Sequence, residues 1–181
     1  MNDPRIVSEP SLYRGLLGDQ LDRLPGSLRR FHDSPRGGKA LGTFRVVRSG
    51  GRIGGLVADL LGLPKAGDHL PVEVEVVAEQ GRERWFRRFP GKTLASKQWN
   101  RGGLLMESFG LGGFTNELKI EGSRMHHIQR TAYLAGVPLP RALAPYATGY
   151  VDGDETGWRV VVKIRVPLLG EIVAYDGRVE P

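Results

Sequence analysis

The sequence predicts an α+β domain: a strongly curved antiparallel sheet or partial β-barrel of about seven to nine strands, with N-terminal helices that cover or plug it. Three observations lead to this prediction. Apolar residues recur at helical spacing only before Pro64. Beyond Pro64, apolar and polar residues alternate and turn signals recur roughly every 8–12 residues, which is typical of an antiparallel meander. The 26 glycines and 12 prolines among 181 residues supply the tight turns that such a sheet needs.

The composition is that of a folded protein, with 40% hydrophobic and 25% charged residues. We expect one domain over residues 11–181, preceded by a flexible leader over residues 1–10. The apolar runs are too short to span a membrane and the N-terminus lacks the apolar segment of a secretory signal, so we expect a soluble, cytoplasmic protein. The absence of cysteine excludes disulfides, thiolate-bound metals and a cysteine nucleophile.

Helical periodicity is confined to three early segments. Ser11 is a suitable N-cap for the first segment, and Pro25 fits the first turn of the second. The third segment, from Ile53 to Leu63, is apolar around most of its circumference. We expect this segment to be a buried helix, with a helix that lies on a membrane surface as the alternative.

The rest of the chain reads as a series of strands separated by turns that contain glycine, proline or asparagine. The predicted strands cover residues 42–48, 72–76, 83–89, 93–99, 104–109, 114–121, 124–133, 146–151, 158–166 and 171–179. The sequence contains no internal repeat and no linker, so these strands belong to one sheet.

The positive charge of the chain does not indicate nucleic-acid binding. The formal net charge is +6, with a pI near 9.9. The basic residues are spread along the chain and interleaved with acidic ones, whereas nucleic-acid-binding proteins concentrate them in a patch or stripe. We therefore expect no nucleic-acid partner.

A set of motifs extends over nearly the whole chain: LYRGLLGD at residues 12–19, LP…LRRFH at 24–32, LLGLP at 60–64, ERWFRRF at 83–89, GVPLPRALAP at 136–145 and PLLG…YDG at 167–177. In combination these motifs resemble the bacterial "domain of unknown function 4166" family. The family has no assigned activity, so the resemblance implies no catalytic residues. Relatives fused to oxidoreductase-like domains imply a place in small-molecule metabolism. The family usually carries an aromatic residue where this chain has His127, so a role of His127 would be particular to this chain.

The pattern that bears on function is polar residues on strand faces that are otherwise apolar. If these faces line the concave side of the sheet, they form an apolar pocket with a few dispersed polar groups, as small-molecule sites do. The expected ligand-binding residues are Trp85, Arg87, Ser96, Gln98, Asn116, Gln129 and Tyr133. We expect Arg87, Gln98, Glu107 and His127 to converge on one cavity.

Arg87 can face either side of its strand, because both alternating sets of residues 84–89 contain an aromatic and an arginine. On the inner face Arg87 needs a charged partner, and Glu107 is the candidate. On the outer face Arg87 would stack on Trp85 and leave Phe86 buried.

Glu107 and His127 are the candidate catalytic pair, because burial tunes a carboxyl and an imidazole toward acid–base work near neutral pH. The alternative is a hydrogen-bond network of the core. His126 and His127 are consecutive strand residues and point to opposite faces, so they do not form a metal site together. We expect neither a metal nor a cofactor.

These observations leave three functions open. The first is binding of an apolar small molecule, lipid- or polyketide-like, in the concavity of the sheet. The second is a cofactor-independent cyclase or isomerase of secondary metabolism that uses the same pocket. The third is a membrane-surface module based on the segment Ile53–Leu63. The sequence does not fix the oligomeric state.

Overall fold

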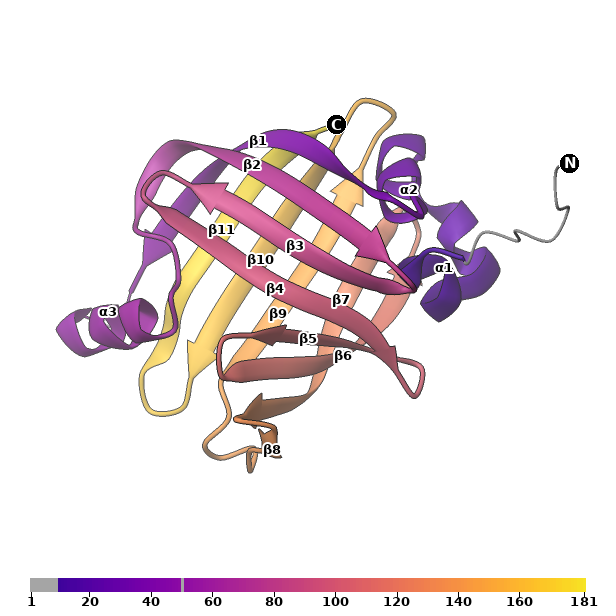
Figure 1. Cartoon of the computed structure of the whole chain (residues 1–181). Helices are drawn as coiled ribbons and strands as arrows, with labels where there is room; N and C mark the ends of the chain where they lie inside the picture. The colour runs from indigo at the N-terminus through magenta and orange to yellow at the C-terminus, as the bar shows by residue number, and fades with distance from the viewer. Residues whose placement is uncertain (1–9, 50) are drawn as a thin grey trace, which may run out of the picture.

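The strands of the chain form one antiparallel sheet that closes into a barrel (Figure 1). The computed structural model describes residues 10–49 and 51–181, so the leader expected over residues 1–10 lies outside the described residues apart from Pro10. The helices are α1 (Leu12–Leu17), α2 (Gly26–His32) and α3 (Gly51–Leu60), with a 3₁₀ helix, η1 (Gly18–Arg23), between the first two. The strands are β1 (Gly37–Arg48), β2 (Gly67–Glu79), β3 (Arg82–Phe89), β4 (Lys92–Arg101), β5 (Leu104–Phe109), β6 (Gly112–Glu121), β7 (Arg124–Leu134), β8 (Val137–Pro138), β9 (Tyr146–Gly153), β10 (Trp158–Val166) and β11 (Gly170–Glu180).

Strand order around the barrel follows the chain. α3 lies in the connection from β1 to β2, and successive hairpins then join β2 to β7. The sheet continues through β9, β10 and β11, and β11 pairs with β1 to close the ring. The short strand β8 pairs with the end of β7 and lies outside the ring.

The predicted α+β fold with a partial barrel of seven to nine strands is wrong. Strands make up 58% of the chain and helices 17%, and ten strands form a closed barrel. The alternation of residues along a strand reports which side chains share a face, but not whether the first and last strands pair. Closure therefore leaves no trace in the pattern.

Alternating burial shows which face of each strand points into the barrel. In β2, Val74 and Val76 are buried inside, whereas Glu73 and Glu75 lie outside and form ion pairs of 2.9 and 2.6 Å with Arg88 of β3. The inner faces of the strands supply much of the hydrophobic core, and the outer faces carry cross-strand charge pairs. A charged side chain on the inner face is therefore an exception that needs an explanation.

The N-terminal helices cover one end of the barrel and form a plug (Figure 1). α1 begins at Ser11, whose hydroxyl accepts a hydrogen bond of 3.0 Å from the backbone N–H of Arg14. Tyr13, Leu21 and Leu28 are almost completely buried against the barrel. The plug therefore closes this end of the barrel with side chains from three consecutive helical segments.

Hydrogen bonds from α2 fix the plug to the turn between β9 and β10. The Ser27 hydroxyl donates to the backbone carbonyls of Asp154 and Gly157, at 2.5 and 3.1 Å. The backbone N–H of Gly26 donates to the Glu155 carboxylate at 3.2 Å. These contacts join parts of the chain that are more than 120 residues apart in sequence.

α3 lies at the opposite end of the barrel, and the prediction that it is buried is wrong (Figure 1). Leu56 and Leu60 are 71% and 85% exposed, and only Gly54 and Ala58 of this helix are buried. α3 contacts the barrel through this stripe of small residues, where a Cβ on Gly54 would lie 2.6 Å from the Ser49 carbonyl oxygen. Ile53, Leu56 and Leu60 therefore face solvent, whereas Val57 packs partly against the core.

The lengths of the helices show whether any of them could span a membrane. Among the described residues, no helix is long and apolar enough to cross a membrane.

Candidate functional site

The inner side chains next to the plug are tightly packed. Leu105 and Met125 are completely buried, Gln98 is 2% exposed, and Trp85 contacts Phe31 and His32 of α2 ring to ring. This layer forms a dry floor at the plugged end of the barrel.

The next layer is not filled. Arg87 and Glu107 keep 24% and 18% of their side-chain surfaces accessible, although both point into the barrel. Leu118, His127 and Tyr175 on the surrounding strands are also only half-buried. Space at least as large as a water molecule therefore borders these inward-pointing side chains.

Arg87, Ser96 and Glu107 form a hydrogen-bonded cluster in this layer. Arg87 donates from Nη1 to the Ser96 hydroxyl at 3.0 Å and from Nη2 to Oε1 of Glu107 at 3.2 Å. The Ser96 hydroxyl donates to the same Glu107 oxygen at 2.6 Å. The Arg87 guanidinium also stacks on the Trp85 ring, 4.9 Å from its centroid. Arg87 thus combines the ion pair expected of an inner position with the aromatic stacking expected of an outer one.

Two further polar contacts connect the plug and the floor. The Tyr13 hydroxyl donates to Oε1 of Gln98 at 3.1 Å, and the Trp85 indole N–H donates to Oε2 of Glu83 at 2.7 Å. Neither Tyr13 nor Glu83 is among the site residues predicted from the sequence. Glu83 alternates with Trp85 and Arg87 on one strand face, so its inner position could have been inferred. Tyr13 carries no such signal, because it meets Gln98 across 85 residues of sequence.

Burial and charge set the protonation of the candidate catalytic pair. Burial alone would raise the pKa of Glu107, but the Arg87 guanidinium and the hydrogen bond from Ser96 bring this pKa below its ordinary value. Burial lowers the pKa of His127, and the Glu107 charge opposes this only in part. At neutral pH Glu107 is therefore anionic, and the neighbouring His127 is neutral.

Two other buried groups near the floor titrate abnormally. Burial raises the pKa of Glu83 to about 7, even though the hydrogen bond from Trp85 favours the ionised form. The pKa of His32 in α2 is lowered to about 3, mainly by burial and to a smaller extent by the positive charges of His127 and Arg87. Nδ1 of His32 is buried without a hydrogen-bond partner among the described residues. His32 is packed by ring contacts with Tyr13 and Trp85 instead.

The structure brings six of the predicted site residues together inside the barrel: Trp85, Arg87, Ser96, Gln98, Glu107 and His127. Asn116 also faces inward, in register with Leu105, and is 5% exposed.

Two predicted ligand-binding residues have other surroundings. The Gln129 amide donates to the Pro145 carbonyl and accepts from the Ala147 backbone N–H, both at 2.8 Å, so it holds the start of β9 in place. Tyr133 does not share the inner face with His127. The register between β6 and β7 shifts at Asn116, and beyond this bulge Ala132, 2% exposed, continues the inner face. Tyr133 instead lies on the outer side, where Arg101 stacks on its ring.

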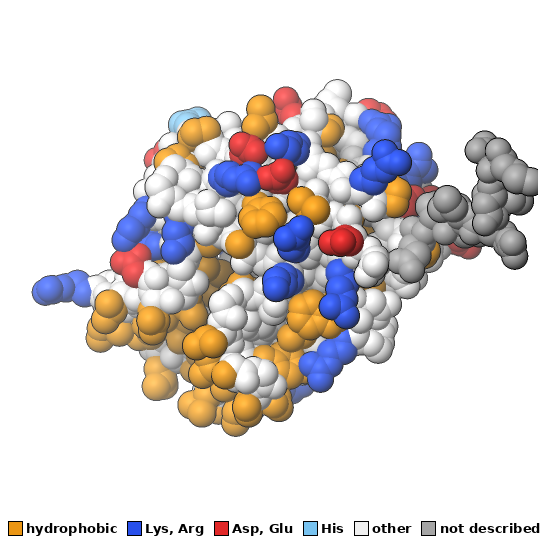
Figure 2. Space-filling view, viewed as in Figure 1, with side chains coloured by type: hydrophobic (Ala, Val, Ile, Leu, Met, Phe, Trp, Pro, Cys, Tyr) orange, Lys and Arg blue, Asp and Glu red, His pale blue; other side chains and the backbone are white. Residues whose placement is uncertain are grey.

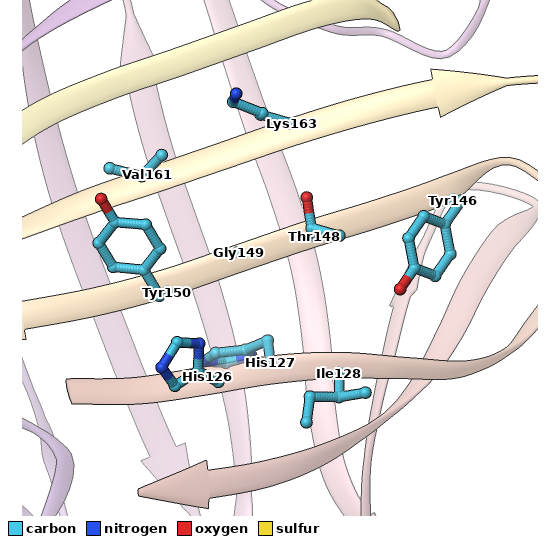
Figure 3. Close-up of a pocket in the computed structure, with 9 residues that line it drawn as sticks. All are labelled: His126, His127, Ile128, Tyr146, Thr148, Gly149, Tyr150, Val161 and Lys163. Atoms are coloured by element: carbon cyan, nitrogen blue, oxygen red, sulfur yellow. The ribbon is translucent and has the colours of Figure 1, made fainter. Parts of the chain in front are cut away.

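A second concave site lies on the outer face of β7, β9 and β10 (Figure 3). This shallow groove has a volume of about 190 Å³ and is lined by residues that include His126, Tyr150 and Lys163. His126 and Tyr150 are register partners on the face opposite His127. Sites for drug-sized ligands measure roughly 300–1,000 Å³, so the groove is small for such a ligand.

Metal-ligating side chains do not gather at either site. Within residues 10–49 and 51–181, no three histidine, aspartate or glutamate side chains lie close enough together to hold a metal ion. The barrel interior contains the Arg87–Glu107 ion pair, and some N–H donors of Arg87 make no hydrogen bond. Arg87 carries five N–H donors and uses two of them in the hydrogen bonds described above.

The fold and this cluster define a class of protein: a closed antiparallel barrel, plugged at one end, with an ion pair in its interior. The chain belongs to the family described as domain of unknown function (DUF4166), whose sequence profile matches residues 24–179. A comparison with curated proteins finds no match.

Proposed function

We propose that the barrel binds an elongated apolar molecule that ends in a carbonyl or carboxylate oxygen. The observation that carries this proposal is the Arg87–Ser96–Glu107 cluster, which borders open space in a barrel whose other walls are largely apolar. A buried ion pair is a poor source of stability, because desolvation of the two charges offsets much of their attraction. A binding role accounts for its position better than a structural one.

The cluster is suited to holding an oxygen-bearing head group. Glu107 and Trp85 fix the orientation of the Arg87 guanidinium, so its remaining N–H groups are aimed before a ligand arrives. Half-buried apolar residues of the same layer and beyond it, among them Leu94, Leu118 and Val162, would contact the apolar body of the ligand. The layer below is dry, so the polar end of the ligand stops at Arg87.

A second candidate function is a cofactor-independent isomerase or cyclase. It is favoured by the protonation states in the cluster, since an ionised Glu107 and a neutral His127 are both competent to accept a proton. Arg87 would polarise a substrate carbonyl, and one of the two bases would remove a proton from the adjacent carbon. If His127 is that base, His127→Phe would abolish turnover and retain binding; if Glu107 is, Glu107→Gln would do so.

Ligand binding is tested first by native mass spectrometry of the purified protein, which reveals a co-purified molecule. The delipidated protein is then titrated with a dansyl-labelled long-chain fatty acid and with its methyl ester. Arg87→Met should weaken binding of the acid by about tenfold or more, equivalent to about 1.4 kcal/mol, and should change binding of the ester less.

The neighbouring residue provides the matched control. Arg88 lies on the same strand with its side chain outside the barrel, so Arg88→Met should leave both affinities unchanged. Arg87→Met also leaves Glu107 buried without its partner, so folding is checked by thermal melting and by the double variant Arg87→Met/Glu107→Gln. Equal affinities in the wild type and in folded Arg87→Met would refute the proposed site.

A further inference from the structure

Exposed apolar side chains gather at the end of the barrel opposite the plug. β1, β3, β5, β7 and β10 all run away from the plug, so the connections that follow them meet at this end, which we call the mouth (Figure 1). Four of these five connections carry large apolar side chains that are 62–106% exposed. We define the apolar rim as Leu56 and Leu60 of α3, Leu111, Val137, Leu143 and Leu168.

The plugged end lacks such a rim. Its hairpin turns, at residues 80–81, 102–103, 122–123 and 154–156, consist of polar residues and glycine. Figure 2 shows hydrophobic side chains concentrated along one side of the molecule, from α3 to the region of β8. Single exposed apolar residues are ordinary on protein surfaces, but their collection on separate connections at one end marks an interaction surface.

Basic residues accompany the apolar rim. Arg52 and Arg141 lie in two of the connections at the mouth, and Lys92 begins β4 directly after a third. All three are exposed, and none of them has an ion-pair partner within the part of the chain that the structure describes. Of the acidic groups at this end, Asp59 and Asp68 are already paired with arginine or lysine, and Glu171 at the start of β11 is outnumbered by the three free cations. The mouth therefore combines apolar side chains with uncompensated positive charge.

We propose that the mouth docks on the surface of an anionic phospholipid bilayer. The rim residues enter the boundary between headgroups and acyl chains, and the three cations lie at the level of the headgroup phosphates. Docking itself needs no ligand. Its purpose rests on the proposed function, because a docked mouth lets an apolar ligand pass between the bilayer and the barrel interior without crossing water.

Charge favours a bilayer over a second copy of the chain. A symmetric dimer through the mouth would place Arg52, Lys92 and Arg141 of the two copies on the same interface, where like charges oppose association. A bilayer with anionic lipids supplies the opposite charge. Its soft surface also accepts apolar side chains that project from separate loops, without the shape complementarity that a protein partner requires.

The proposal is tested by flotation of the purified protein with vesicles. One set contains phosphatidylcholine alone, and the other contains phosphatidylcholine with about one third phosphatidylglycerol. The wild type should float with the anionic vesicles, and high salt should weaken this binding. Leu56→Ser/Leu60→Ser should lower the bound fraction at least about fivefold, and Arg52→Ala/Arg141→Ala should lower it most at low salt.

Leu41 supplies a matched control, because it is 68% exposed on the outer face of β1 in the half nearer the plug. Leu41→Ser should bind vesicles as the wild type does. All three variants change exposed side chains, and circular dichroism verifies that they remain folded. Absence of flotation with anionic vesicles would overturn the proposal, as would an equal loss of binding in Leu41→Ser and Leu56→Ser/Leu60→Ser. A dimer in solution that Leu56→Ser/Leu60→Ser dissociates, without vesicle binding, would assign the mouth to a second copy instead.

The Arg87→Met variant separates this inference from the proposed function. It should float with anionic vesicles as the wild type does, because Arg87 lies inside the barrel. If the mouth docks and the interior binds nothing, flotation persists while the fatty-acid titration fails. If the interior binds the fatty acid and the mouth does not dock, the titration succeeds and flotation fails.

Discussion

Replacement of Glu83 by glutamine should change how the stability of the barrel depends on pH. Glu83 is 4% exposed, and its only hydrogen bond among the described side chains comes from the Trp85 indole. Burial raises its pKa from 4.5 to about 7, so the folded state holds a proton that the unfolded state has released between these values. Glutamine retains an oxygen for the Trp85 N–H and carries no charge at any pH.

The sign and size of the effect follow from linkage. Below pH 4.5 Glu83 is protonated in both states and contributes nothing to the pH dependence. As pH rises toward about 7, ionisation favours the unfolded state, and above that pH the folded barrel contains a buried carboxylate. The difference between the two pKa values corresponds to about 3 kcal/mol. For a chain of this length that amounts to roughly 6–12 °C in melting temperature.

The assay is urea unfolding of the wild type and Glu83→Gln at several pH values from 5 to 8. Other titrating groups are common to both proteins and cancel in the difference, which should grow in favour of the variant by up to about 1.4 kcal/mol per pH unit below pH 7. Glu75→Gln serves as the control, because hydrogen bonds from Arg88 and Lys39 lower the pKa of Glu75 and this carboxyl is ionised in both states across this range, so its difference from the wild type should not change with pH. A difference for Glu83→Gln that stays constant across this range would refute the reasoning.

Three further changes test the packing. His32→Phe keeps the ring contacts and removes a buried nitrogen without a partner, so it should stabilise the barrel by about 1–3 kcal/mol at pH 7.5. The gain should be larger at pH 5, because His32 of the wild type takes up a proton there in the unfolded state but not in the folded state. Urea unfolding at both pH values measures the two gains, and a smaller gain at pH 5 would contradict the prediction. Leu60→Asp should leave the melting temperature within about 2 °C of the wild type, because the side chain is exposed; a large drop would show that α3 packs on the barrel through this residue. In Gly177→Ala the new Cβ would lie 2.3 Å from the Phe44 ring, so calorimetry should show that the free energy of unfolding falls by at least about 2 kcal/mol. Adding Phe44→Leu should restore part of this stability. If the effects of the two substitutions on stability simply add, the two residues do not interact.

Local patterns carried much of the information on this fold. Alternation identified the strands, and the polar residues on apolar faces pointed to the side chains that meet inside the barrel. The parity of Arg87 could not be decided, because each alternating set of its strand contains an aromatic and an arginine. Tyr133 was misplaced because the bulge in β7 leaves no mark in the residue types.

Tertiary features were beyond the reach of such patterns. The apolar character of α3 predicted burial, but the helix rests on the barrel through Gly54 and Ala58 and leaves its leucines exposed. The contact of Tyr13 with Gln98 depends on where the plug sits, and closure of the barrel depends on the pairing of strands that are far apart in sequence. The periodicity of apolar residues shows which face of a helix or strand is apolar. These features depend instead on which other elements pack against it.

The pairing of β1 with β11 has a consequence for the kinetics of folding. The other ladders of the barrel join strands that are close in sequence, with α3 between β1 and β2 and the short β8 between β7 and β9, so they can form by local pairing. The β1–β11 ladder joins residues such as Leu41 and Glu180, and its formation requires closure of a loop that spans most of the chain. Until this ladder forms, the meander has two open edges that can pair with other chains. We expect closure of this seam to be the slow step of refolding and the stage at which aggregation competes with it.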